Sequence, residues 1–190
     1  MVTAAVSAVT ADPDSRVRIA ALGALVRRAG ARPTRIAWTR AAADPDGRVR
    51  RRAAELAPLL ATPPVRRLAR LLDDDDPLVA ETAAWALGEC GDRARFCVRR
   101  LGRLATTHDD PLVREAAVAA LGAIGDRRGV GAILAATTDK PAVRRRAVLA
   151  LAPFEGEEVD TALIRASTDR DWQVRDAARA LGVSDPGACP

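Results

Sequence analysis

Few side chains in this chain have the chemistry of a catalyst. His108 is the sole histidine, so a Ser-His-Asp or Cys-His device for nucleophilic catalysis would have to use it. It stands beside Asp109 and Asp110 in a polar segment just before a proline, where we expect a capping or solvent-facing role. The sequence also lacks a glycine-rich phosphate loop. It therefore predicts no catalytic residues and no enzymatic activity.

Metal ligands are equally sparse. Cys90, Cys97 and Cys189 form no C-x-x-C pair, and with His108 they make four potential ligands scattered along the chain. A tetrahedral zinc site needs four such ligands in one cluster, so we expect Cys90 and Cys97 to be buried as small apolar side chains. The acidic run 73–76 directly precedes a proline, whereas a calcium loop spaces its oxygen ligands around a glycine. We expect a helix-capping turn there, and no metal or cofactor.

Arginine dominates the charge. The 190 residues carry a formal net charge of +5 with a pI of about 10.3, and Lys140 is the lone lysine. Adjacent arginines could contact nucleic-acid phosphates, and they stand at 27–28, 50–52, 66–67, 99–100 and 144–146. High-GC coding produces the same alanine and arginine bias without selection for binding. Basicity alone is therefore weak evidence for a polyanionic partner.

The sequence gives no sign of a membrane segment. No run is apolar for long enough to span a bilayer, and residues 1–10 lack the basic start and extended apolar stretch of a signal peptide. We therefore expect a cytoplasmic protein with no membrane partner.

A repeat of about thirty residues runs through the whole chain. Each copy has a short turn rich in aspartate or proline, then a valine that arginine usually follows, then alanines and a leucine at helical spacing. The lead valines are Val17, Val49, Val79, Val113, Val143 and Val174, so the steps are 32, 30, 34, 30 and 31 residues. A period of this length is typical of a solenoid of stacked two-helix units.

The fourth copy shows why each unit is expected to fold as two helices. Residues 109–111 supply a capping carboxylate and a proline suited to a first helical turn. Val113, Ala117, Ala120 and Leu121 then share one helical face. This face is mostly alanine, so the unit gains stability by stacking on another copy.

A second, shorter helix is expected in each copy, and we name the two helices A and B in chain order. The A helices are predicted at about 2–10, 33–42, 63–72, 93–105, 127–137 and 157–167, and no segment has the period of a strand. The six repeats are then 2–29, 33–61, 63–91, 93–125, 127–153 and 157–183. We expect one solenoid over 1–183, followed by a tail at 184–190.

The turns carry a family resemblance. Residues 12–18 read Asp-Pro-Asp-Ser-Arg-Val-Arg, residues 44–50 read Asp-Pro-Asp-Gly-Arg-Val-Arg, and Ala-Leu-Gly recurs at 86–88 and 120–122. These strings closely resemble HEAT repeats of the short bacterial kind that phycobilin lyases also contain, over about residues 3–182. The resemblance implies an all-α fold, a right-handed solenoid of about six antiparallel helix pairs.

The resemblance also implies a role for the recurring charges. In HEAT proteins the turn aspartate and the arginine after the valine commonly form hydrogen bonds between successive repeats. The corresponding positions are Asp12, Asp44, Asp74 and Asp169, with Arg18, Arg50, Arg114, Arg144 and Arg175. We expect a structural ladder from these residues. Ala80 interrupts the arginine series, which predicts a local weakness or bend near the third repeat.

HEAT solenoids line their concave side with B helices, so the resemblance places a binding surface there. With the lead valine inward, residues two and six positions later lie on the opposite helical face. They are Ile19 and Gly23, Arg51 and Glu55, Glu81 and Trp85, Glu115 and Ala119, Arg145 and Leu149, and Asp176 and Ala180. From them we predict a partner-binding surface of Trp85, Glu81, Arg51, Glu55, Glu115, Arg145 and Leu149.

The three tryptophans are assigned different roles. Trp85, on an otherwise polar face, has the character of an interaction hot spot, although its indole could instead lean onto an adjacent repeat. Trp38 is expected in the core or on the convex surface. Trp172 stands where other copies have proline, and we expect it to cover the end of the last repeat.

Enzymes with related repeats use residues that this chain lacks. Deoxyhypusine hydroxylases carry repeated His-Glu pairs for a di-iron centre, and no His-Glu occurs here. The scarcity of aromatic residues disfavours a tetrapyrrole groove, and the mixed charges of the predicted surface disfavour the strongly basic groove of alkylpurine glycosylases.

We therefore predict a non-catalytic adaptor that holds a protein or peptide segment on the concave B-helix surface. The alternative is a HEAT-like nucleic-acid-binding protein that contacts phosphates through the arginine clusters. We expect a monomer or a weak end-to-end dimer formed through the weakly charged first helix.

Overall fold

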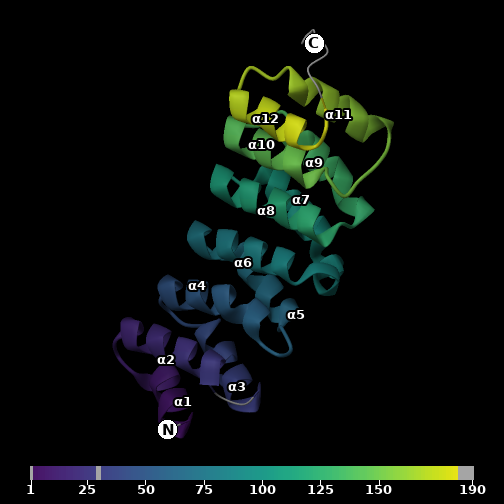
Figure 1. Cartoon of the computed structure of the whole chain (residues 1–190). Coiled ribbons are helices and arrows are strands. Elements are labelled where there is room, and N and C mark those ends of the chain that lie inside the picture. The colour runs from purple at the N-terminus through teal and green to yellow at the C-terminus, as the bar shows by residue number, and fades with distance from the viewer. Residues whose placement is uncertain (1, 29–30, 184–190) are drawn as a thin grey trace. The chain divides into compact units, whose positions relative to one another are not determined.

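The structure, a computed structural model, describes residues 2–28 and 31–183 (Figure 1). These residues form twelve α-helices and four short 3-10 helices, and they contain no strand. The predicted all-α class is confirmed. Among the same residues, no helix is both long enough and apolar enough to cross a membrane.

The contacts divide the chain into two compact units, Met1–Cys90 and Gly91–Pro190, and each is described by itself. The single folding unit expected over 1–183 stays a prediction. The expected tail at 184–190 lies outside the described residues.

The first unit consists of three A–B helix pairs. Its A helices are α1 (Val2–Ala11), α3 (Ala31–Ala41) and α5 (Val65–Leu68), and α5 continues into the 3-10 helix η2 (Ala69–Asp73). Its B helices are α2 (Ser15–Arg28), α4 (Gly47–Leu56) and α6 (Pro77–Glu89), with the 3-10 helix η1 (Ala57–Leu59) after α4. Helix α4 packs between α2 and α6, as Figure 1 shows.

The second unit repeats this plan. Its A helices are α7 (Val98–Thr107), α9 (Val130–Ala136) and α11 (Glu157–Ser167), and the first two follow the 3-10 helices η3 (Gly91–Cys97) and η4 (Arg127–Gly129). Its B helices are α8 (Pro111–Ile124), α10 (Pro141–Ala150) and α12 (Trp172–Ala180), with α10 packed between the other two. The predicted A-helix segments are therefore helical, although those near 63–72, 93–105 and 127–137 are partly 3-10.

Four of the B helices, α4, α6, α8 and α12, begin at an aspartate cap in the preceding turn. Asp46, Asp76, Asp110 and Asp171 are N-caps, and each carboxylate accepts a hydrogen bond from the backbone N–H two residues later. Asp76 is the last member of the acidic run 73–76, which confirms a capping turn at that position. Helix α8 ends at Gly125, whose φ of 65° is the left-handed conformation that glycine adopts freely.

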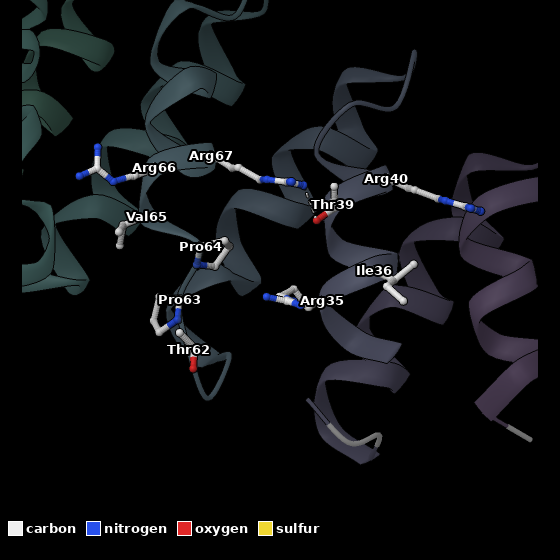
Figure 2. Close-up of a pocket in the computed structure, with 10 residues that line it drawn as sticks. All are labelled: Arg35, Ile36, Thr39, Arg40, Thr62, Pro63, Pro64, Val65, Arg66 and Arg67. Carbon is white, nitrogen blue, oxygen red and sulfur yellow. Dashed lines mark hydrogen bonds between the residues drawn. The ribbon is translucent and has the colours of Figure 1, made fainter. Parts of the chain in front are cut away.

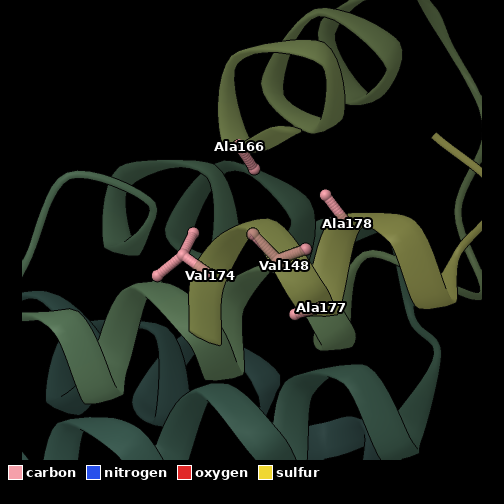
Figure 3. Packing of buried hydrophobic residues seen from close by; sticks show 5 residues of the cluster. All are labelled: Val148, Ala166, Val174, Ala177 and Ala178. Carbon is pink, nitrogen blue, oxygen red and sulfur yellow. The ribbon is translucent and has the colours of Figure 1, made fainter. Parts of the chain in front are cut away.

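Small side chains form the buried faces of the B helices. The lead valines of the second to sixth repeats and the alanines four residues later are buried. They are Val49 and Ala53, Val79 and Ala83, Val113 and Ala117, Val143 and Ala147, and Val174 and Ala178. Figure 3 shows this packing at the end of the second unit, where Val148 of α10 and Ala166 of α11 meet the buried face of α12.

The first repeat departs from the pattern. Val17 is 41% exposed, so the assumption that every lead valine points inward is wrong there. Helix α2 still buries Ala21, Leu22 and Leu25, which continue the same stripe. The exposed part is the first turn of α2, and the described residues include no earlier B helix that could cover it.

Helices α8 and α10 approach each other very closely at a glycine. A Cβ atom added to Gly122 would lie 2.7 Å from the Cα of Ala150 and 2.8 Å from its Cβ. Backbone atoms cannot yield as a flexible side chain can. At Gly131 of α9, by contrast, an added Cβ would meet no atom within 4 Å.

These two glycines should respond oppositely to alanine. Gly122→Ala should lower the free energy of unfolding by about 1–3 kcal/mol, because α8 and α10 must move apart. Gly131→Ala should raise it by about 0.5–1 kcal/mol, because alanine favours the helix and fills open space. Urea denaturation of both variants measures the difference. Equal stability of the two would contradict the close approach.

Candidate partner-binding surface

Arginine and aspartate join successive repeats within each unit. Each arginine donates from Nε and Nη2 to both oxygens of one carboxylate in the next repeat, the bidentate geometry that guanidinium favours. The pairs and their N···O distances are Arg18–Asp44 (2.8 and 2.8 Å), Arg50–Asp74 (2.7 and 2.7 Å), Arg114–Asp139 (2.7 and 2.7 Å) and Arg144–Asp169 (3.0 and 2.8 Å). We call these four pairs the ladder.

The ladder residues also hold the turns. Nη1 of Arg50 donates to the carbonyl oxygens of Asp44 and Pro45 at 2.9 and 3.1 Å, in the turn just before its own helix. Its partner Asp74 accepts a further hydrogen bond from the backbone N–H of Asp76 at 3.0 Å. One arginine therefore links its own turn to the turn of the next repeat, which fixes where the next B helix begins.

Two of the expected ladder residues, Asp12 and Arg175, make only local hydrogen bonds among the described residues. Asp12 accepts a local hydrogen bond from the backbone N–H of Asp14, and Arg175 donates to the carbonyl oxygens of Asp169 and Arg170 in its own turn. Asp139 was missing from the expected set. It lies four residues before its lead valine, whereas Asp44, Asp74 and Asp169 lie five before theirs, so a fixed spacing passes over it.

Between the third and fourth repeats, the ladder lacks both its arginine and its aspartate. Ala80 takes the arginine position in α6, and His108 takes the aspartate position five residues before Val113. Nδ1 of His108 accepts from the backbone N–H of Asp110 at 3.1 Å, the local bond that a ladder aspartate also accepts. The division between the two compact units falls at Cys90 and Gly91, between these two positions in the sequence.

Ladder arginines change the acidity of their partners. They lower the pKa of Asp74, Asp139 and Asp169 below the ordinary carboxyl value, chiefly through the side-chain hydrogen bonds from the guanidinium groups. Burial opposes this change but is outweighed. These three carboxylates are therefore held in the charged form in the folded protein.

In the first unit, the predicted surface residues lie on α4 and α6. Trp85 is 47% exposed, and Glu81, one turn earlier on α6, is half-buried. Neither side chain makes a hydrogen bond or an ion pair with another described residue. On α4, Glu55 receives Nη1 of Arg52 at 2.8 Å and faces Nε of Arg51 at 3.5 Å.

A hollow of about 500 Å³ lies between α2 and α4, and Arg51 and Glu55 belong to its lining. Its lining comprises Ile19, Ala20, Gly23, Arg27, Arg48, Arg51, Arg52 and Glu55. Sequence reasoning missed Arg52 as the closer partner of Glu55, although their i, i+3 spacing on a helix is a signal for this pairing.

In the second unit, the predicted residues lie on α8 and α10. Glu115 accepts from Nε and Nη2 of Arg146, each at 3.3 Å, so its charge is matched across the two helices. Leu149 lines a small hollow of about 160 Å³ together with Ala119 and Gly122. Arg145 is half-buried. The predicted residues are thus distributed over both units.

The other tryptophans and the cysteines differ in how deeply they are buried. Trp38 is fully buried, and its Nε1 donates to the carbonyl oxygen of Ala53 at 2.6 Å. Trp172 is 65% exposed at the first position of α12. Cys97 is buried and Cys90 is half-buried, while Cys189 lies outside the described residues. No group of three potential metal ligands occurs in the part of the chain that the structure describes.

Paired A and B helices with a recurring arginine–aspartate contact define a helical repeat protein of the solenoid class. The sequence matches HEAT repeats over residues 36–96, 64–138 and 98–182. The chain therefore belongs to the HEAT-repeat family, which confirms the resemblance seen in its turns. Among the curated proteins, none matches it significantly in sequence.

Solved structures of repeat proteins are similar in fold. A designed armadillo repeat protein in complex with the peptide (KR)4 is 17% identical, with a TM-score of 0.67 over 95% of this chain and 97% of that one. The complex of CpcE and CpcF of phycocyanin lyase from Nostoc sp. PCC7120 is 21% identical, with a TM-score of 0.67 over 94% of this chain and 74% of that one. At these identities the likeness shows the fold.

The lowered pKa of the ladder carboxyl groups predicts a dependence of stability on pH. A carboxyl group whose pKa is lower in the folded than in the unfolded state stabilises the protein above its unfolded pKa, and this contribution is lost as the pH falls through the folded value. Asp74→Asn should therefore reduce the loss of unfolding free energy between about pH 6 and pH 3.

The exposed neighbour provides the matched control. Asp75→Asn removes the same charge next to the ladder, and Asp75 makes no ion pair among the described residues. Its pH dependence should match that of the unsubstituted protein. If Asp74→Asn also leaves the curve unchanged in chemical denaturation at several pH values, the role assigned to the ladder carboxyl group is wrong.

Proposed function

We propose that this HEAT-repeat protein is a non-catalytic adaptor that binds a segment of another protein on the exposed face of its B helices. The observation that carries the proposal is Trp85, a large apolar side chain that is 47% exposed on α6, a helix most of whose other residues are buried. Tryptophan is enriched among the interface residues that contribute most to binding, because burying an indole in a partner removes a large apolar area from water.

The surroundings of Trp85 support a polypeptide as the partner. Glu81 on the same helix is partly exposed and free of ion pairs among the described residues, so it can accept hydrogen bonds from a bound segment. Arg51 on α4, 45% exposed at its side chain, can donate them. A surface that offers an apolar anchor, an acceptor and a donor suits the mixed chemistry of a peptide.

Comparison with known folds gives limited support of the same kind. One similar structure is a designed armadillo repeat protein that was solved with a peptide bound. A second is a complex of two chains, CpcE and CpcF. Repeat proteins of this architecture thus associate with polypeptides, and we extend that property to this chain as part of the proposal.

The arrangement of arginines disfavours nucleic acid on this face. Arg50 and Arg144 are committed to the ladder, and Arg52 and Arg146 are paired with Glu55 and Glu115. A phosphate binder needs cations that are not already neutralised by carboxylates. We therefore favour a protein partner. The B helices would bind it through an apolar anchor and hydrogen bonds, and not through a basic stripe.

Trp85→Ala should remove partner binding without unfolding the protein. Truncating an interface tryptophan typically costs about 2 kcal/mol or more of binding free energy, whereas a half-exposed side chain should change stability by less than about 1 kcal/mol. The measurement is a quantitative pull-down with mass spectrometry, with melting temperatures recorded in parallel.

Trp172→Ala is the matched control, because Trp172 is also an exposed tryptophan, at 65%, and is not one of the residues of the predicted partner-binding surface. Its captured proteins should equal those of the unsubstituted chain. The proposal fails if both variants capture the same proteins as the unsubstituted chain, or if Trp85→Ala strongly lowers the melting temperature, which would make the indole part of the core.

A further inference from the structure

The A-helix side of the first unit has a charge pattern that neither the ladder nor the B-helix surface accounts for. Residues 31–43 and 57–72 contain no aspartate or glutamate, and their arginines are Arg32, Arg35, Arg40, Arg66, Arg67 and Arg70. The aspartates of the ladder all lie in turns before B helices. Positive charge on this side is therefore not offset by carboxylates of the same segments.

Two of these segments enclose a hollow of about 630 Å³ (Figure 2). One wall is α3, which contributes Arg35, Ile36, Thr39 and Arg40, and the other wall is residues 62–67, which lead into α5. In Figure 2, the side chain of Arg67 extends across to Thr39 of α3, and the side chain of Arg35 extends from α3 toward the wall that carries Pro63 and Pro64. Nη1 of Arg67 donates to Oγ1 of Thr39 at 2.9 Å, which ties one wall to the other.

The hollow is prepared to receive an anion. The side chain of Arg35 makes no hydrogen bond or ion pair with any described residue, so all the donors of its guanidinium group are available to a ligand. Arg67 uses one N–H donor for the hydrogen bond to Thr39, and its other donors are available to a ligand. Two guanidinium groups that line one hollow from different walls can each bind a carboxylate through two parallel hydrogen bonds.

Part of the lining of the hollow is apolar. Ile36 is 44% exposed, and Pro63, Pro64 and Val65 complete this part of the lining. Two successive prolines restrict the backbone of their wall, so little conformational entropy is lost there when a ligand binds. An apolar side chain of a ligand can therefore be buried at low cost beside its carboxylates.

We propose that this hollow binds an acidic segment of a partner protein, in which carboxylates contact Arg35 and Arg67 and an adjacent apolar side chain packs on Ile36 and the two prolines. This A-side site is separate from the B-helix surface and does not depend on Trp85. It would give the protein a second point of attachment with its own selectivity.

A nucleic acid fits the same features less well. Its backbone would satisfy the arginines but would leave the isoleucine and proline surface without an apolar partner. Aromatic side chains, the usual platforms for base stacking, are absent from the lining. Charge together with apolar lining therefore favours an acidic polypeptide over a phosphodiester chain.

Fluorescence anisotropy with defined probes tests the proposal. The probes are a short labelled peptide that alternates glutamate with leucine, its counterpart with lysine in place of glutamate, and single-stranded oligothymidine, all at physiological salt. The unsubstituted protein should bind the glutamate peptide and not the lysine peptide. Arg35→Gln/Arg67→Gln should weaken that binding by at least about tenfold, because charged hydrogen bonds are lost.

Variants of equal charge separate the site from general attraction. Arg32→Gln/Arg70→Gln removes the same two charges outside the hollow, and it should change affinity by less than about twofold. Arg35→Lys/Arg67→Lys keeps the charge but loses the planar fork, so it should bind more weakly than the unsubstituted protein. Melting temperatures of all variants verify folding.

Several results would overturn the proposal. They are failure to bind the glutamate peptide, equal binding of the lysine peptide, an equal loss in Arg32→Gln/Arg70→Gln, or tighter and more steeply salt-dependent binding of oligothymidine. Trp85→Ala should bind the glutamate peptide normally. This last measurement distinguishes failure of the A-side site from failure of the B-helix surface.

Discussion

The bidentate contact between an arginine of one repeat and an aspartate of the next is the constraint on which the rest of the structure depends. Valine and alanine supply the buried area, but their small, smooth side chains specify poorly how far one helix is displaced along its neighbour. A planar guanidinium that also bonds the carbonyl groups of its own turn defines that displacement. Within each unit, the ladder thereby decides which residues of a B helix face outward.

This use of arginine changes how the charge of the protein is to be interpreted. The net charge of +5 is weak evidence for a polyanion binder, and the ladder and the pairs with Glu55 and Glu115 neutralise arginines of the B helices. The basic character that remains in the first unit is strongest on its A-helix side, where residues 31–43 and 57–72 carry no carboxylates. The two faces thus differ in chemistry: one has an exposed indole and mixed charge, and the other has a hollow lined by arginines and apolar side chains.

The sequence predicted the helices well because a thirty-residue period repeats one local pattern of cap, stripe and turn. It predicted the partners of the ladder less completely: the shorter turn before Val143 concealed Asp139, and Val17 looked like every other lead valine although its side is uncovered. The sequence left Trp38 between the core and the convex surface, because its burial depends on how α3 packs against α4, where the carbonyl oxygen of Ala53 accepts from its Nε1. The hollow between α3 and α5 also escaped, since it arises from two segments whose separation no local pattern encodes.

A double-mutant cycle on Arg144 and Asp169 tests the central claim most directly, with Arg127 and Glu158 of the same unit as the reference. The first pair has side chains 7% and 17% exposed, and the second is a 3.7 Å contact between side chains 66% and 58% exposed. We expect a coupling free energy of about 2 kcal/mol for Arg144→Met with Asp169→Asn, and below about 1 kcal/mol for Arg127→Met with Glu158→Gln. A ladder coupling no larger than that of the exposed pair would contradict the account.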